Sequence, residues 1–108
     1  MTRQTVPTAL LEDVENYCNV TWNDEATNDK FRGMIAAGAA YLDSKLRYPA
    51  DYEADGLPRS LLFDYVRYAR DSALDVYENN YQSMILAAQH EGLVTDNAVE
   101  STISPANR

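Results

Sequence analysis

The stretch GLPRSLLFDYVRYARDSALDVYENNYQSMILAAQHEG, from Gly56 to Gly92, decides the fold class. Its apolar residues recur every three or four positions, which is the spacing of an amphipathic helix. The helix is expected to begin at the Leu-Pro pair after Gly56, because proline suits a first helical turn. Unbroken to Gly92, it would be about 50 Å long, whereas a compact chain of this size has a radius of gyration of about 13 Å. We therefore expect its distal part to fold back or to project towards a partner, with Asn79-Asn80 as a kink or short break.

Three stripes appear on this helix when one residue is placed every 100°. The predicted core face holds Leu62, Tyr65, Val66, Ala69, Ala73, Val76, Tyr77 and Met84. An acidic ridge opposite it, solvated or facing a channel, holds Asp64, Asp71, Asp75 and Glu78, together with Arg67 and Gln82. A flank between the two holds Phe63, Arg70, Leu74, Tyr81 and Ile85. The flank is either part of a wide core, covered by the first helix or the tail, or a subunit contact, since interface cores favour aromatic residues, Met and Arg.

Two further helices are expected before this stretch. The first covers residues 8 to 17 or 18, with Thr8 as its N-cap. The second begins near Asn23 or Asp24, which are good N-caps, and runs to about Leu46. Trp22 precedes it at the position of a hydrophobic staple residue. No stretch predicts a strand with confidence, so the expected fold is all-α, a small helical bundle with one long C-terminal helix.

The second helix has an apolar face and a charged one. The apolar face is formed by Phe31, Ile35, Gly38, Leu42 and Leu46, flanked by Met34 and Tyr41. Asp43 and Arg47 on the opposite side are spaced for an i,i+4 ion pair. Glycine inside a helix costs about 1 kcal/mol relative to alanine, so Gly33 and Gly38 indicate that a neighbouring helix approaches closely there.

The loop and the tail complete the chain. Residues 47–56 are a loop whose tyrosines, Tyr48 and Tyr52, predict either a contact surface or a packed cover over the core. Residues 93–108 are polar, and we expect a tail that is flexible or becomes ordered on assembly. The predicted organisation is therefore one helical domain over residues 1–92, followed by this tail.

Composition limits the function. The chain has 108 residues, with 17 acidic and 9 basic side chains and a net charge of -8. Such a chain repels nucleic acid on average, because nucleic-acid binders neutralise phosphates with Lys and Arg. A single cysteine, Cys18, excludes an internal disulfide and a cysteine-based zinc site, and a single histidine, His90, excludes most histidine-ligated metal sites. With no phosphate-binding loop and no nucleophile-histidine pair, we expect neither an enzyme nor a cofactor or metal, and no apolar run is long enough to span a membrane.

A series of motifs resembles one protein family. The series comprises TWNDE at 21–25, Phe31 with Ile35, AYLD at 40–43, GLPRSLLFDY at 56–65, Arg67-Tyr68, Ala73-Leu74 and YQS at 81–83. In order and spacing it resembles the head–tail connector proteins of long-tailed bacteriophages, also described as adaptor, head completion or DNA packaging proteins. The resemblance covers about residues 8–91, and the tail takes no part in it.

The resemblance implies a structural role in the virion. A small helical bundle would be made in the host cytoplasm and form a ring of about twelve copies at the neck, under the portal of the capsid vertex. Its partners would be copies of itself, the portal protein and the next neck or tail completion protein. DNA would pass through the ring without specific binding, and no catalysis or membrane is implied.

Charge and apolar surface agree with such a ring. A closed ring needs two different faces on each subunit, and the candidates for the subunit interface are Phe63, Arg70, Leu74, Tyr81 and Ile85 on one side and Met34 and Tyr41 on the other. Twelve copies would carry a charge of roughly -100, which repels the phosphates of a passing genome. Like-charged subunits also repel one another within about 10 Å at 0.1 M salt, so ring formation should be weak at low salt and rise with salt or portal.

Two other functions compete with this one. The chain could be an acidic helical interaction module, a DNA mimic or an inhibitor, that presents the acidic ridge to a basic partner protein. A DNA-binding packaging subunit is the other, but it needs a basic surface. Only Arg59, Arg67 and Arg70 cluster on the long helix, with acids between them.

Overall fold

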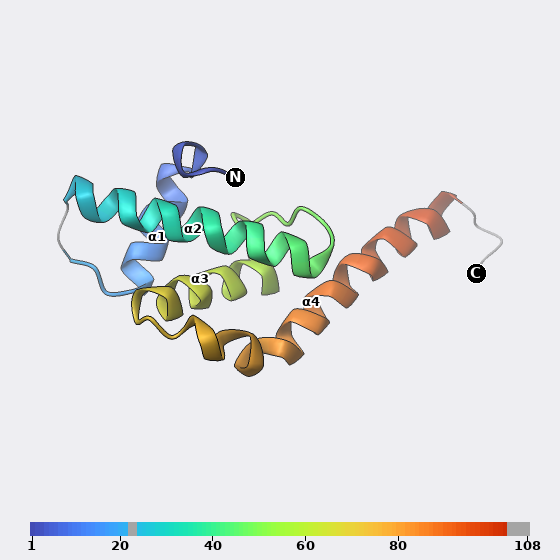
Figure 1. The fold of residues 1–108 in the computed structure, drawn as a ribbon. Coiled ribbons are helices and arrows are strands. Elements are labelled where there is room, and N and C mark those ends of the chain that lie inside the picture. Colours follow the sequence, from blue (N-terminus) through green and yellow to red (C-terminus); the bar gives the residue numbers. More distant parts are fainter. Residues whose placement is uncertain (22–23, 104–108) are drawn as a thin grey trace.

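Four α-helices and one short 3-10 helix form the regular structure of the part of the chain that the computed structural model describes, residues 1–21 and 24–103, with side chains up to Gly92 (Figure 1). In chain order they are η1 (Arg3–Thr5), α1 (Thr8–Tyr17), α2 (Glu25–Leu46), α3 (Leu57–Arg70) and α4 (Leu74–Ile103). The all-α prediction is confirmed.

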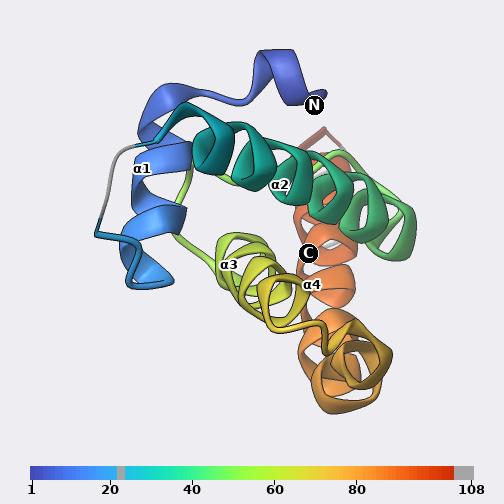
Figure 2. The same cartoon turned by 60° about the vertical axis from the view of Figure 1, so that its left-hand side comes forward.

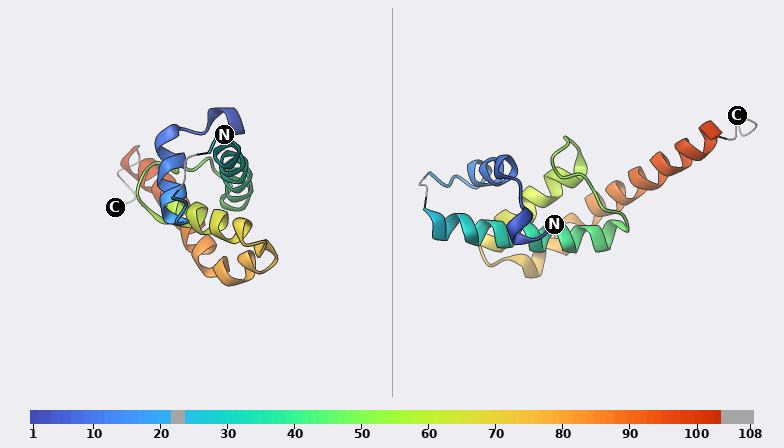
Figure 3. Two further views of the ribbon diagram at one scale, coloured as in Figure 1. Left: turned by 90° about the vertical axis from the view of Figure 1, so that its left-hand side faces the viewer. Right: turned by 90° about the horizontal axis from the view of Figure 1, so that it is seen from above.

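The first three α-helices form a bundle, and α4 leaves it. Helices α2 and α3 lie side by side, and α1 packs against both (Figure 2). Helix α4 packs on α3, α2 and the loop between them as far as Gly92, after which it projects away from the bundle (Figures 1 and 3). The molecule therefore measures 56 × 28 × 19 Å, and its radius of gyration is 15.8 Å. Both alternatives for the distal part of the long helical stretch are observed, because α4 first folds back along α3, with Tyr77 bonded to Leu61, and its last turns then project (Figure 1).

The helix expected to run without interruption up to Asn79-Asn80 is in fact broken after Arg70. Ser72 has a φ of 57°, and its N–H donates to the carbonyl of Ala69 at 3.1 Å while the N–H of Ala73 donates to the carbonyl of Tyr68 at 2.8 Å. These two bonds are those of a Schellman motif, which usually has glycine at the left-handed position. The break expected at Asn79-Asn80 is also wrong, since α4 passes through both residues without interruption.

The start of α2 has the predicted side-chain cap, whereas the start of α1 does not. Thr8 is the first helical residue, so the N-cap position falls on Pro7 rather than on Thr8. Asp24 caps α2, and its Oδ2 accepts from the backbone N–H of Thr27 at 3.1 Å. The predicted staple residue Trp22 and the alternative cap Asn23 lie outside the described residues.

The end of α2 differs from the prediction. Arg47 is left-handed, with a φ of 69°, while Asp43 is turned towards the loop. The Oδ1 of Asp43 accepts from the hydroxyl of Tyr52 at 2.7 Å and from the backbone N–H of Ala50 at 3.2 Å. Asp43 therefore fastens the loop to α2, and it was wrong to expect an i,i+4 partner for Arg47.

The loop between α2 and α3 is a packed cover over the core. Tyr52 is 3% exposed, and the hydroxyl of Tyr48 donates to the backbone carbonyl of Ala88 on α4 at 3.0 Å. Of the two predicted roles for the loop tyrosines, a contact surface or a packed cover over the core, the structure shows the packed cover.

Close approach at the two glycines of α2 is confirmed. A Cβ on Gly38 would lie 2.8 Å from Leu62 and 2.7 Å from Tyr65, both on α3. At Gly33 the neighbour is the guanidinium of Arg3 in η1 rather than a helix.

Helix α4 reaches beyond the predicted domain boundary. It ends at Ile103, so its backbone includes residues 93–103 of the polar segment predicted to be a tail. Residues 104–108 lie outside the described part of the chain.

Candidate assembly surface

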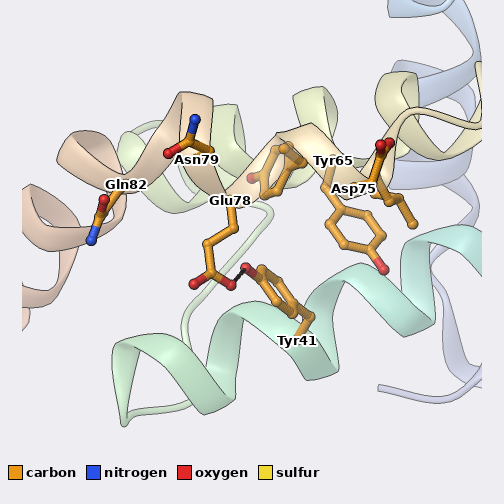
Figure 4. Close-up of a pocket in the computed structure, with 8 residues that line it drawn as sticks. Tyr41, Tyr65, Asp75, Glu78, Asn79 and Gln82 are labelled. Atoms are coloured by element: carbon orange, nitrogen blue, oxygen red, sulfur yellow. Dashed lines mark hydrogen bonds between the residues drawn. The ribbon is translucent and has the colours of Figure 1, made fainter.

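A tyrosine-lined groove lies between the C-terminal half of α2 and the first turns of α4. Its volume is about 570 Å³. Its lining consists of Tyr41, Tyr65, Leu74, Asp75, Tyr77, Glu78, Asn79 and Gln82 (Figure 4). A second groove of about 360 Å³ adjoins it and shares Glu78 and Gln82; it extends to Arg47 and Leu86.

Glu78 connects α4 to α2 at the centre of these grooves. The hydroxyl of Tyr41 donates to its Oε1 at 2.6 Å, as Figure 4 shows, and the Nζ of Lys45 lies 3.2 Å from the same oxygen. The hydrogen bond from Tyr41, followed by that from Lys45, lowers the pKa of the Glu78 carboxyl. Burial and the same carboxylate raise the pKa of the Tyr41 hydroxyl. The predicted acid is therefore held by its own chain rather than being part of a free ridge.

Tyr77 holds α4 against α3. It is 1% exposed, and its hydroxyl donates to the backbone carbonyl of Leu61 at 2.7 Å. Its ring is stacked on Tyr81 with centroids 4.8 Å apart and meets Tyr65 and Tyr68 edge-on. Burial raises the pKa of the Tyr77 hydroxyl, so this group is a neutral hydrogen-bond donor at physiological pH.

The predicted flank is divided by the break after Arg70. On α3, Phe63 packs edge-on against Tyr17 of α1, with ring centroids 5.5 Å apart, and Arg70 donates a hydrogen bond to the carbonyl of Cys18. Helix α1 therefore covers this half of the flank in part. Cys18 itself is buried in the core.

The α4 half of the flank is divided again. Ile85 is 7% exposed and belongs to the core, and half-buried Tyr81 stacks on Tyr77. Only Leu74 is well exposed, at 40%. On α2, Met34 and Tyr41 are half-buried and pack against the core cluster. The five interface candidates on the long helical stretch thus do not form one surface, because grouping them assumed an unbroken helix, whereas the structure has a break after Arg70.

The acidic ridge is divided for the same reason. The side chain of Asp64 is only 15% exposed; it accepts a hydrogen bond from the hydroxyl of Tyr17 and lies 3.5 Å from Arg67. Burial and Asp64 raise the pKa of Tyr81 to about 12. Asp71 pairs with Arg70 at 3.2 Å.

The outward side of α4 is the feature that the helical wheel missed. We call Val76, Asn79, Ser83, Leu86, Ala87 and His90 the outer face of α4; all are exposed. Val76, placed in the predicted core, is 43% exposed, and Leu86 is 56% exposed. A signal was present in the sequence, because residues 79–90 contain no charged residue in a chain that is 24% charged. His90, expected near a helix end, lies within α4.

Three comparisons with known proteins give no relative. No family model, curated protein or solved structure matches this chain.

Within the described residues, no helix combines the length and apolar character needed to cross a membrane. Over the same residues, no three or more His, Cys, Asp or Glu side chains are grouped so that they could hold a metal ion.

Proposed function

We propose that this protein is a structural subunit of a bacteriophage neck. Copies of it form a ring between the portal and the next neck or tail protein, and the ring extends the channel through which DNA passes. The observation that carries the proposal is that α4 packs on its own bundle with one face only. Its outer face, including Val76 and Leu86, stays in solvent. Beyond Gly92, which lies against Tyr48 of the bundle, the helix continues away from the bundle (Figure 1).

Exposed apolar side chains on a projecting helix are more typical of a subunit than of a free-standing domain. A radius of gyration of 15.8 Å, against about 13 Å for a compact chain of this size, means that the elongated shape exposes extra surface. A neighbouring copy would cover that surface, and copies added head to tail around an axis close into a ring.

The charge supports passage of DNA rather than its capture. Each copy carries -8, and a ring of about twelve copies would carry roughly -100, which repels phosphate from the lumen. The same charge opposes assembly until salt screens it or the portal supplies contacts.

The mass of the assembled species tests the proposal. Light scattering is measured for the chain alone from low salt to about 1 M salt, and again with a portal protein present. We expect monomers at low salt and a ring-sized species at high salt or with portal. A Leu86→Asp variant should stay monomeric with an unchanged helical signal, whereas Glu53→Asp, on an exposed loop residue, should assemble as the parent does.

A chain that remains monomeric at every salt concentration and with portal present would overturn the proposal. A one-to-one complex with a basic protein that is not a portal would instead favour the acidic interaction module. That complex should weaken when Asp71 and Asp75 are neutralised, whereas a ring should be affected much less.

A further inference from the structure

The turn between α3 and α4 is weakly encoded by its own residues. Ser72 lies at the left-handed position, with a φ of 57°, where a side chain is unfavourable and glycine is usual. Ala73 immediately precedes α4, and its methyl group cannot accept a hydrogen bond from the first backbone N–H groups of that helix. Asp71 and Ser72 are exposed, so burial of their side chains does not fix the turn. Local chemistry therefore gives little reason for the chain to break here.

The apolar pattern of the sequence continues through the turn. On one unbroken helix, a single stripe would hold Leu62, Val66, Ala69, Ala73, Tyr77 and Met84. Such a helix would run from Leu57 to Ile103 and would be about 70 Å long. We call this the straight form, and we call the arrangement in the structure the folded-back form. Packing of α4 on the bundle is what favours the folded-back form.

The contacts that hold α4 on the bundle lie outside the turn. The hydroxyl of Tyr77 donates to a backbone carbonyl of α3 at 2.7 Å. On α2, the hydroxyl of Tyr41 donates to Glu78 at 2.6 Å, and the Nζ of Lys45 lies 3.2 Å from the same carboxylate oxygen. Because none of these groups belongs to residues 71–73, the same contacts form whether α4 comes from the same chain or from another copy.

We propose that α3 and α4 straighten into one helix on assembly, and that α4 then packs on α2 and α3 of the next copy instead of its own. The inference rests on the proposed ring and assigns the contact that links its copies. Each copy gives one α4 and receives one, so exchange in one direction repeats from copy to copy and closes into a ring. The exchange uses the side of α4 opposite to its outer face, so that face stays available to a neighbouring copy.

The exchange has little to overcome in contact energy. It keeps the contacts of α4 with α2 and α3, and it removes the left-handed conformation of Ser72. Short turns under strain favour such exchange between copies. The opposing terms are the freedom that copies lose on association and the repulsion between their acidic charges. The balance between monomer and ring therefore depends on the turn, on salt and on protein concentration.

Cross-linking of mixed isotopes tests which copy supplies α4. Isotope-labelled and unlabelled chains are mixed in equal amounts as monomers at low salt and then assembled at high salt. A carbodiimide is added, which joins a lysine to a carboxylate that it contacts, as Lys45 does Glu78. In the assembled species about half of the Lys45–Glu78 linked peptides should contain both isotopes, because each α4 meets a partner at random. The monomers at low salt should give single-isotope pairs only, and Glu78→Gln should give no such pair.

Substitutions in the turn test the straightening. Ser72→Gly should lower the association constant about tenfold, because glycine relieves the turn of the monomer and weakens the straight helix. Ser72→Ala should raise it about two- to threefold, since alanine is the better helix former. The matched control is Ser83→Gly, an exposed position that is helical in both forms, and it should leave the association constant nearly unchanged. Circular dichroism and urea unfolding check that each variant is folded.

The outcomes separate this inference from the proposed function. Single-isotope Lys45–Glu78 pairs in the assembled species overturn the exchange and leave the ring standing. Mixed pairs in a species of two copies support the exchange and overturn the ring. A Ser72→Gly chain that assembles as strongly as the parent overturns the straightening of α3 into α4, and a chain that never assembles overturns both proposals.

Discussion

Helices α3 and α4 share one continuous apolar pattern in the sequence but have different surroundings in the structure. Helix α3 lies inside the bundle, with α1, α2 and α4 all packed against it. Helix α4 is covered on one face from its first turn to about Gly92 and then leaves the bundle (Figure 1). The difference shows that a helical period in the sequence identifies the apolar face of a helix. It does not show how many of the helix's other faces the rest of the fold will cover.

The largest expected effect on stability comes from a substitution on the buried side of α4, compared with one on its exposed side. Tyr77→Ala should lower the free energy of unfolding by about 3–5 kcal/mol, because it empties a fully buried aromatic site and leaves the carbonyl of Leu61 without its donor. Leu86→Ala, on the outer face, should change it by less than about 0.5 kcal/mol. Urea unfolding of the monomer at low salt measures both, and equal losses would mean that α4 is covered on both sides.

A substitution on α2 tests how tightly α3 is held. Gly38→Val should cost about 1–3 kcal/mol, because its side chain would overlap Leu62 and Tyr65 of α3. Gly33→Ala is the matched change on the same helix, and there only the flexible side chain of Arg3 has to move. If thermal unfolding shows Gly38→Val to be as stable as Gly33→Ala, the close contact between α2 and α3 is disproved.

The break between the two helices gives a smaller effect of opposite sign. Ser72→Gly should raise the free energy of unfolding by about 0.5–1 kcal/mol, since glycine adopts a positive φ without the cost that other residues incur. Asp71→Gly, one residue earlier at a φ of -88°, should lower it. A loss of stability in Ser72→Gly would argue for a helix that continues through this position.

The smallest expected effect on stability concerns the hydrogen bond from Tyr41 of α2 to Glu78 of α4, and it depends on pH. The pKa of Glu78 is lowered in the folded state, so the stabilisation that the charged Glu78 carboxylate gives to the fold is fully present above the ordinary carboxyl pKa. The contribution is lost as the pH falls through the lowered value in the folded state. The stability difference between the parent chain and Glu78→Gln should therefore shrink on acidification in this range. Urea midpoints from pH 7 to pH 3 measure it, with Glu53→Gln as the exposed control, and a difference that stays constant would rule out the linkage.

Parts of the candidate surface could be found from local chemistry alone. The sequence placed Glu78 on an acidic ridge and Tyr41 at a subunit contact, whereas the structure shows them bonded to each other within one chain. The uncharged run 79–90 was visible in the sequence and would have identified the outer face of α4, had charge spacing been weighed alongside apolar spacing. What no pattern showed is that Ile85 is buried while Val76 is exposed, because that follows from the direction in which α4 leaves Ala73.

The sequence by itself determined the helical class, the start of α2 at its Asp24 cap, the close approach at Gly38, and the strongly acidic charge. These features depend on residues near one another in the chain, on backbone sterics and on composition. Only the tertiary structure decided where the long stretch breaks and which side of each half is covered. Serine is not a strong sequence signal for the left-handed position of a Schellman motif, so the break could not be read from local sequence. The three-residue turn between α3 and α4 also changes the direction of every side chain on α4 relative to those on α3, so one helical period cannot describe both helices.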